Sequence, residues 1–178
     1  GGTADHSGYE ILASPFTDAS LQHLLQPEVP ENQILAEATV FEESRVAGTS
    51  ASFESGWVPL ADFNEVMAPG KAIRAKVAKN KVLSLTGTLQ SDPVAVNGLT
   101  LGTGPQSGWH LLGNPYAAPL DWRKVTIPAG MGHALYTLNS TGNYQSYVNG
   151  LSTGSQANLI LPMRGFFLRV QEGTVNLQ

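Results

Sequence analysis

The chain of 178 residues contains no cysteine. Disulfide bonds, thiolate metal sites and cysteine nucleophiles are therefore excluded together. Secreted domains of eukaryotes commonly depend on disulfides, whereas a cysteine-free exported domain is ordinary in bacteria.

Charge is also scarce. Charged residues make up 13% of the chain, and 10 basic against 14 acidic side chains give a net charge of −4. No basic stripe is present, so we expect no nucleic-acid partner. A surface with so few charges must consist largely of Ser, Thr, Asn, Gln and Gly, a composition common in extracellular β-proteins.

Long apolar runs are missing as well. None approaches the roughly 20 residues that span a bilayer, so we expect no membrane insertion. The chain begins Gly1-Gly2 instead of Met and shows no signal peptide, which is typical of a processed or excised segment.

Helical periodicity is confined to one segment. Residues 18–25 place three leucines on one face, Asp18 stands where it would cap such a helix, and Pro27 would end it. The sequence therefore predicts at most one or two short helices.

Short runs of β-forming residues account for most of the chain. They are separated by 19 Gly and 11 Pro, and by the turn pairs Asn97-Gly98, Ser107-Gly108 and Asn149-Gly150. Several runs alternate apolar and polar residues, as half-buried strands do. We expect strands over residues 38–41, 81–86, 94–101, 133–138 and 165–170.

An internal duplication is the strongest signal. Residues 8–16 and 108–116 share the order Gly, aromatic, polar, two aliphatics, two small residues, Pro, aromatic. Four later landmarks recur in order: 40–41 with 135–136, 56–57 with 143–144, 70–73 with 165–168, and 81–83 with 174–176.

Repeats of this length predict two similar units that bury their apolar faces together. The expected fold is all-β. We expect a pseudo-symmetric, jelly-roll-like β-sandwich built from two related β units, or two closely packed β lobes, and not two independent domains. We expect a flexible N-terminal segment over residues 1–7 and a single domain over 8–178, made of repeats at about 8–101 and 108–178.

The second repeat stops early, because Gln178 falls inside the counterpart of the strand expected at residues 81–86. Either the protein continues beyond this point or a strand is missing and a sheet edge needs cover. A neighbouring copy could supply that strand by edge addition, with residues 1–7 as the donor.

The segment Gly108-Trp109-His110-Leu111-Leu112-Gly113-Asn114-Pro115-Tyr116, followed by Pro119-Leu120-Asp121-Trp122, carries a family resemblance. It resembles a motif of large surface and secreted proteins of Bacteroidota, many of them exported by the type IX secretion system. The similarity continues through residues 134–136, 144–150 and 165–168.

This resemblance implies an exported β-sandwich module within a long multidomain chain, located outside the cell or on the outer cell surface. It implies no catalytic residue. The C-terminal sorting domain that such proteins carry is not found in this sequence.

The polar residues form none of the common catalytic or metal-binding motifs. No Gly-x-Ser-x-Gly motif and no Asp-x-Asp-x-Asp-Gly loop occurs. Gly102-Thr103-Gly104-Pro105 contains a proline and precedes no helix, so it does not predict a phosphate site. We therefore predict no enzyme activity, no catalytic residue, no metal and no cofactor.

The remaining titratable groups are scattered. His110 and His133 could face one another across strands, whereas His6 and His23 have no suggestive neighbour. Among carboxylates, Glu42 and Glu43 are neighbours that would point to opposite faces of a strand and cannot form a glycosidase pair together. Asp62 and Asp121 are the other carboxylates considered for such a pair.

Asn114-Pro115 and Ser14-Pro15 are interpreted structurally. A residue before proline is extended, and Asn or Ser can close a side-chain turn there. We expect a strand end that turns sharply in each repeat.

Aromatic residues are the candidates for a ligand surface, because exposed rings can pack against sugars. Tyr144 and Tyr147 are three residues apart and would face opposite sides of a regular strand. Trp57 and Trp109 occupy strand-like positions that favour the core. The ligand-binding candidates are Trp122, Tyr144, Tyr147 and Trp57.

These observations favour a non-catalytic structural or adhesive module of a bacterial cell-surface or extracellular protein, which could assemble with copies of itself or with other domains of its parent protein. The alternative is a carbohydrate-binding module of a secreted multidomain enzyme, with glycans as partners. That alternative predicts an exposed, coplanar pair of aromatic rings.

Overall fold

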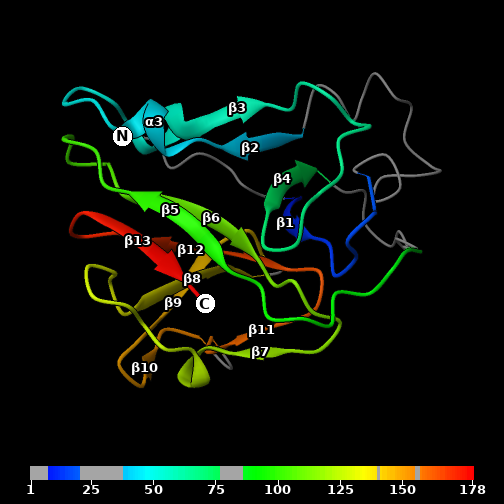
Figure 1. Ribbon diagram of the computed structural model, residues 1–178. Coiled ribbons are helices and arrows are strands. Elements are labelled where there is room, and N and C mark those ends of the chain that lie inside the picture. Colours follow the sequence, from blue (N-terminus) through cyan, green and yellow to red (C-terminus); the bar gives the residue numbers. More distant parts are fainter. Residues whose placement is uncertain (1–7, 21–37, 77–85, 140, 155–156) are drawn as a thin grey trace.

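The computed structural model describes residues 8–20, 38–76, 86–139, 141–154 and 157–178 (Figure 1). Antiparallel strands account for nearly all regular structure in these ranges, which confirms the all-β, sandwich-like fold. The helical elements described are single turns: α3 (Glu43–Val46), η1 (Phe53–Gly56) and η2 (Trp122–Lys124).

The first repeat forms a four-stranded antiparallel sheet. Its strand order is β1-β4-β2-β3. The strands are β1 (Tyr9–Ala13), β2 (Thr39–Phe41), β3 (Trp57–Pro59) and β4 (Ala72–Lys76).

The second repeat forms a five-stranded antiparallel sheet with the order β10-β9-β8-β12-β6. Its strands are β6 (Trp109–Gly113), β8 (Ala134–Leu138), β9 (Tyr144–Val148), β10 (Leu151–Ser152) and β12 (Gly165–Arg169). Two ribbons accompany it: β5 (Val96–Thr100) with β13 (Thr174–Leu177), and β7 (Leu120–Asp121) with β11 (Leu159–Ile160).

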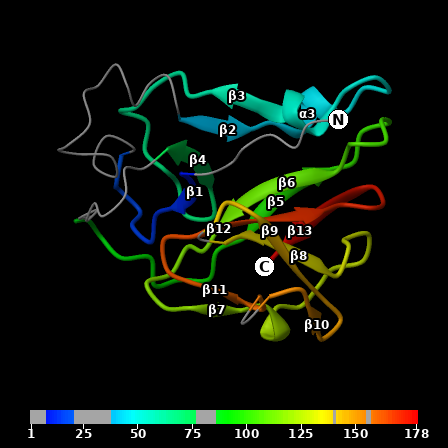
Figure 2. The ribbon, with the colours of Figure 1, turned by 180° about the vertical axis from the view of Figure 1, so that it is seen from behind.

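The two sheets share one topology. The order β1-β4-β2-β3 in the first matches β6-β12-β8-β9 in the second. In both views β2 and β3 lie at one end of the molecule, and β7, β10 and β11 lie at the opposite end (Figures 1 and 2).

The strand register corrects one part of the predicted repeat alignment. Ala13 pairs with Ala72 in the first sheet, and Gly113 pairs with Gly165 in the second. Gly165 therefore corresponds to Ala72, not to Gly70, and the predicted alignment was wrong by two residues. A two-residue slip keeps every side chain on the same face, so the apolar pattern alone does not reveal it.

A Pro-containing turn precedes β4 and β12 at equivalent places. Lys71 N donates to Ala68 O at 3.0 Å, and Arg164 N donates to Leu161 O at 3.2 Å. The third residue of each turn has a positive φ, +88° at Gly70 and +61° at Met163. With proline at the second position, both are type II turns.

The two units also bond to each other symmetrically through these turns. Ala13 N donates to Met163 O at 3.0 Å, and Gly113 N donates to Gly70 O at 2.8 Å. Because Ala13 corresponds to Gly113 and Met163 to Gly70, an approximate twofold relation connects the two sheets.

Three apolar clusters fill the molecule in layers. The central cluster lies between the sheets and includes Ile11, Ala72, Leu111 and Phe167. The other faces of the two sheets each cover a separate cluster, one around Ile73 in the first unit and one in the second unit. Small residues allow the sheets to approach, since a Cβ at Gly113 would collide with the Lys71 carbonyl oxygen.

The strand at residues 96–100 is present, but it belongs structurally to the second unit. β5 pairs with β13, and Leu99 and Val175 are buried together in the second unit's core. The C-terminal strand is thus paired within the chain. The predicted strand at 81–86 and the proposed donor segment 1–7 lie outside the described residues.

Two local predictions are corrected. Asn97-Gly98 is no hairpin turn, because both residues lie inside β5, where Gly98 N donates to Asn176 Oδ1 at 2.9 Å. Asp18 accepts from Thr88 N and Oγ1, and the rest of the helix predicted at 18–25 falls largely outside the described residues. By contrast, Asn149-Gly150 does form the turn between β9 and β10, with φ of +48° and +91°.

Candidate functional site

A cavity of about 300 Å³ opens where the first sheet meets the second. Strands β1, β8, β9, β11 and β12 or their adjoining turns contribute to its walls. Its polar residues are Glu10, Thr137, Asn139, Gln145 and Arg164.

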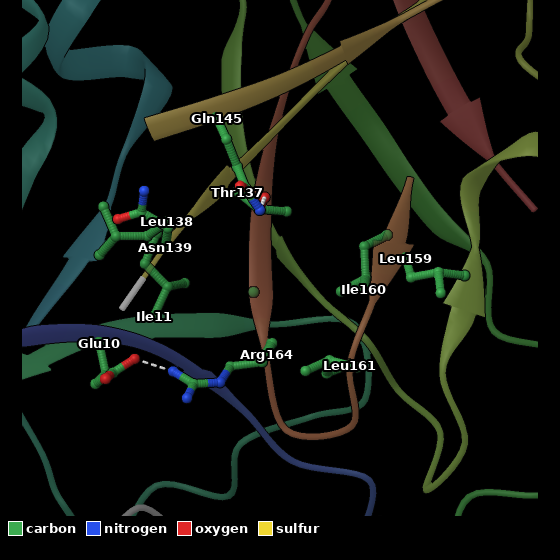
Figure 3. A pocket seen from close by; sticks show the side chains of 11 residues that line it. Glu10, Ile11, Thr137, Leu138, Asn139, Gln145, Leu159, Ile160, Leu161 and Arg164 are labelled. Atoms are coloured by element: carbon green, nitrogen blue, oxygen red, sulfur yellow. Dashed lines mark hydrogen bonds and ion pairs between the residues drawn. The ribbon is translucent and has the colours of Figure 1, made fainter. Parts of the chain in front are cut away.

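An ion pair joins the two units at this cavity. Arg164 Nη1 donates to Glu10 Oε2, and the two side chains point toward one another in Figure 3. Their side chains are 44% and 31% exposed, so the pair is accessible to water. Burial lowers the pKa of the Arg164 guanidinium from its ordinary value.

The type II turn explains why Arg164 reaches β1. Arg164 follows the turn residue Met163, and its backbone bridges to Leu12. Glu10 lies two residues before Leu12 on β1, so both side chains emerge at the same junction.

The polar residues across the cavity come from adjacent strands. Thr137 and Gln145 pair in register on β8 and β9, and Gln145 Nε2 donates to Thr137 Oγ1 at 3.1 Å. Asn139 Oδ1 accepts from Thr141 N and Asn143 N, which closes the turn between these strands. Figure 3 shows Gln145 and Thr137 on the side of the cavity opposite Glu10 and Arg164.

The side chains of this cavity are suited to binding a polar ligand. It offers a carboxylate, a guanidinium, amides and a hydroxyl, which together donate and accept hydrogen bonds. Thr137 Oγ1 accepts from Gln145 Nε2, and among the described residues it makes no hydrogen bond to a histidine or a carboxylate.

The four aromatic candidates are placed apart. Trp122 is only 3% exposed and lies in the second unit's core. Tyr144 contacts Phe167 on the inner face of β9, with ring centroids 6.0 Å apart, whereas Tyr147 packs on the opposite face. Trp57 is half-buried and packs against the central cluster. Tyr144 is the one exposed ring of the four, at 38%, so these residues form no exposed pair.

Two aromatic environments are electrostatically distinctive. The Arg74 guanidinium lies 3.8 Å from the Trp57 ring centroid. Burial raises the pKa of the Tyr144 hydroxyl to about 12. Neither Trp57 nor Tyr144 lines the junction cavity.

His110 and His133, which could have faced one another across strands, do not lie on paired strands. β12 lies between β6, which carries His110, and β8, which begins just after His133. His110 Nε2 instead bonds to Thr100 O at 2.8 Å, and burial lowers the pKa of its imidazole.

The predicted strand position of Glu42 and Glu43 is also wrong, because β2 ends at Phe41 and α3 starts at Glu43. Glu43 Oε1 accepts from Gly102 N and Gly108 N, each at 3.0 Å. This carboxylate therefore joins the first repeat to the start of the second.

The other two carboxylates are engaged locally. Asp62 Oδ1 accepts from Asn64 N at 2.8 Å. Arg123, helped by Asn158, holds the pKa of the Asp121 carboxyl well below its usual range. Neither carboxylate belongs to the junction cavity.

Glu10 and Arg164 did not emerge as candidates from the sequence. Glu10 is a single charged residue within β1, and Arg164 is a single charged residue just before β12. Only their pairing in space distinguishes them. An alignment of the two repeats at the correct register would have placed Arg164 at the position of Lys71, directly after the shared turn. This shared basic position is the one sequence signal that could have identified Arg164.

Fold and site together define an all-β, sandwich-like protein with a polar cavity between two related sheets. No protein-family model, curated protein or solved structure matches the chain. Among the described residues, no group of three or more His, Asp or Glu is placed to hold a metal ion. None of the helices in the described ranges is long and apolar enough to cross a membrane.

Proposed function

We propose that this chain is a non-catalytic structural or adhesive module of a bacterial cell-surface or extracellular protein, and that it associates with copies of itself or with other domains of its parent. Its low charge and its resemblance to exported Bacteroidota modules support this proposal. An exposed leucine on an edge strand is the observation that carries it.

That edge is β10, the outermost strand of the second sheet. Leu151 on this strand is 79% exposed, more than any other large hydrophobic residue described. Edge strands offer unpaired backbone groups to another chain, and an apolar side chain there favours association.

The edge at the opposite end of the molecule carries a proline, whereas the two-residue strand β10 carries none. β3 is the corresponding edge of the first sheet, and it ends at Pro59. Proline has no N–H to donate and blunts an edge against strand addition. Association should therefore proceed through β10.

Light scattering over a concentration series tests this proposal. We expect particles larger than the 18.9 kDa monomer whose fraction grows with concentration. Leu151→Lys should return the protein to a monomer, because lysine protects edges from pairing. Leu89→Lys, at a position 53% exposed outside the sheets, is the matched control and should leave assembly unchanged.

A monomer at all concentrations would contradict the self-association part of the proposal. Equal loss of assembly in both variants would contradict the role of β10, since it would indicate a general effect of added charge.

A carbohydrate-binding module is the second candidate, and the junction cavity favours it. At about 300 Å³ the cavity is at the lower end of small-ligand sites, and its mixed donors and acceptors match hydroxyl groups. A glycan array would show binding that Gln145→Ala abolishes. An array without signal would remove this candidate.

A further inference from the structure

The tetrapeptide Val-Asn-Gly-Leu occurs twice in the chain, at residues 96–99 and 148–151. The first copy lies entirely within the strand β5, whereas the second connects β9 to β10 with Asn149 and Gly150 as the turn. β5 lies near the middle of the molecule and β10 lies at one end (Figures 1 and 2). One Asn-Gly dipeptide with the same neighbours therefore occurs in two different structures.

An asparagine followed by glycine can react with its own backbone. The glycine nitrogen attacks the side-chain carbonyl carbon of the asparagine, a C–N bond forms, and ammonia leaves with the proton of the attacking N–H. Water then opens the resulting succinimide ring at either carbonyl and gives aspartate or isoaspartate, with no change of oxidation state. Because the reaction is intramolecular and glycine has no side chain to obstruct its nitrogen, its rate depends on how freely the dipeptide reaches the reactive geometry.

The strand β5 restrains its copy of the dipeptide. Gly98 N donates to Asn176 Oδ1 at 2.9 Å, across the paired strands β5 and β13. Leu99, the next residue, is 5% exposed and belongs to the second unit's core. To react, Asn97 must lose this hydrogen bond and leave a strand that is fixed by a buried leucine.

The turn between β9 and β10 leaves the attacking nitrogen available. Asn149 and Gly150 are exposed, and no hydrogen bond of Gly150 N occurs among the described residues. Leu151, which follows, is 79% exposed and does not anchor the turn. Two residue pairs and a bond from Thr153 N to Ser146 O at 2.9 Å hold β10 to β9, and so short a hairpin opens at low cost.

We propose that Asn149 is a site of spontaneous deamidation and that the fold protects Asn97, which lies in the same tetrapeptide. In the folded protein Asn149 should react at least about tenfold faster than Asn97. The residues on either side are identical, so the local sequence does not account for this difference.

Deamidation of Asn149 changes the edge strand β10, and this consequence rests on the proposed association through β10. Aspartate adds a negative charge beside Leu151, and charges on an edge strand oppose pairing. Isoaspartate also inserts a backbone carbon into a two-residue turn, which shifts β10 out of register with β9. The assembled fraction should therefore decline as the protein ages.

Mass spectrometry of the aged protein measures both reactions. The folded chain is incubated at mildly alkaline pH and digested with trypsin, which separates the two sites at Arg123 and Lys124. Replacement of the side-chain NH₂ by OH identifies each deamidated peptide, and the peptide that contains Asn149 should convert first. In concentrated urea the two rates should agree within about twofold, because the unfolded chain retains only the shared local sequence.

Two variants test the structural cause. Asn176→Ala removes the acceptor of the Gly98 N–H and should speed the reaction at Asn97 about fivefold, with no change at Asn149. Asn149→Gln keeps a side-chain amide but requires a larger ring, so deamidation at this position should be lost. An unchanged rate at Asn97 in Asn176→Ala would overturn the hydrogen bond as its protection.

Equal rates at the two asparagines in the folded protein would overturn the proposal, and so would the same difference in folded and unfolded chains. Asn149→Asp tests the consequence for β10, since it should lower the assembled fraction in light scattering. Asn97→Asp adds the same charge within β5 and should not, so equal assembly of both variants would overturn that consequence. A chain that is monomeric at all concentrations would remove the effect on assembly together with the proposed association, whereas the two rates would still decide whether Asn149 is a deamidation site.

Discussion

Arg74 in β4 and Phe167 in β12 occupy the same place in their two sheets. Arg74 lies two residues after Ala72, which pairs with the last residue of β1. Phe167 lies two residues after Gly165, which pairs with the last residue of β6. Phe167 is buried at the centre of the aromatic cluster, whereas the Arg74 side chain is 13% exposed and lies over the Trp57 and Tyr9 rings.

This difference shows how a duplicated fold loses its symmetry. Two equivalent side chains cannot both fill one central space between two sheets that approach closely. In this protein Phe167 occupies the centre, and its equivalent, Arg74, carries a charge. The apolar part of the Arg74 side chain packs, while its guanidinium contacts aromatic rings. Glu54, 3.9 Å from Arg74, offsets part of the cost of burying that charge.

Alanine at these two positions should therefore have unequal effects, and this is the largest change that we predict. Phe167→Ala removes a ring whose centroid lies 5.0 Å from that of Phe41 and 5.6 Å from that of Trp57. The variant should lower the free energy of unfolding by about 3–5 kcal/mol. Arg74→Ala should lower the free energy of unfolding by only about 1–2 kcal/mol. The variant loses a cation–π contact, but the loss is partly offset because a desolvated charge is removed. Urea unfolding measures both, and equal losses would contradict the asymmetry.

The strand-end turns of the two repeats form a second comparison. Ser14 Oγ accepts from Phe16 N at 3.1 Å, and Asn114 Oδ1 accepts from Tyr116 N at 3.0 Å. Both residues are 0% exposed. The amide of Asn114 does more, since its Nδ2 also donates to Ala118 O and Ile160 O, each at 2.9 Å.

Asn114→Ala should cost more than Ser14→Ala for this reason. The asparagine variant leaves two buried carbonyl oxygens and one N–H without their partner, at about 1 kcal/mol or more each, for a total of about 3 kcal/mol. The serine variant should cost about 1 kcal/mol. Urea midpoints at constant slope provide the comparison, and a larger loss in the serine variant would contradict this account.

Local patterns were sufficient to predict much of this fold. Alternation of apolar and polar residues marked β8 and β12, and the Ser-Pro and Asn-Pro pairs predicted the side-chain turns. The opposite orientation of Tyr144 and Tyr147 followed from the period of a strand. These features depend on neighbours in the chain, so a sequence carries them directly.

Features that depend on distant partners were missed. Asn97-Gly98 has the composition of a hairpin turn, but burial of Leu99 beside Val175 holds it within β5. The junction cavity depends on Glu10 and Arg164, which are distant in the chain and follow no local motif. Trp122 was selected as a surface candidate because it lies near loops, yet its side chain enters the core.

The shared type II turn makes the smallest and sharpest comparison. Gly70 and Met163 both have positive φ, a conformation that glycine adopts freely and other residues adopt at a cost of about 1–2 kcal/mol. Met163→Gly should relieve this cost but also increase the entropy of the unfolded chain. The net result should be a free energy of unfolding that is higher by up to about 1 kcal/mol. Gly70→Ala should do the reverse and lose about 1–2 kcal/mol, because its Cβ would also lie 3.1 Å from Val96 Cγ2. Both changes can be measured by thermal unfolding. A destabilised Met163→Gly would show that packing of the methionine side chain outweighs the backbone conformation, and the two turns would then be equivalent in shape but not in what stabilises them.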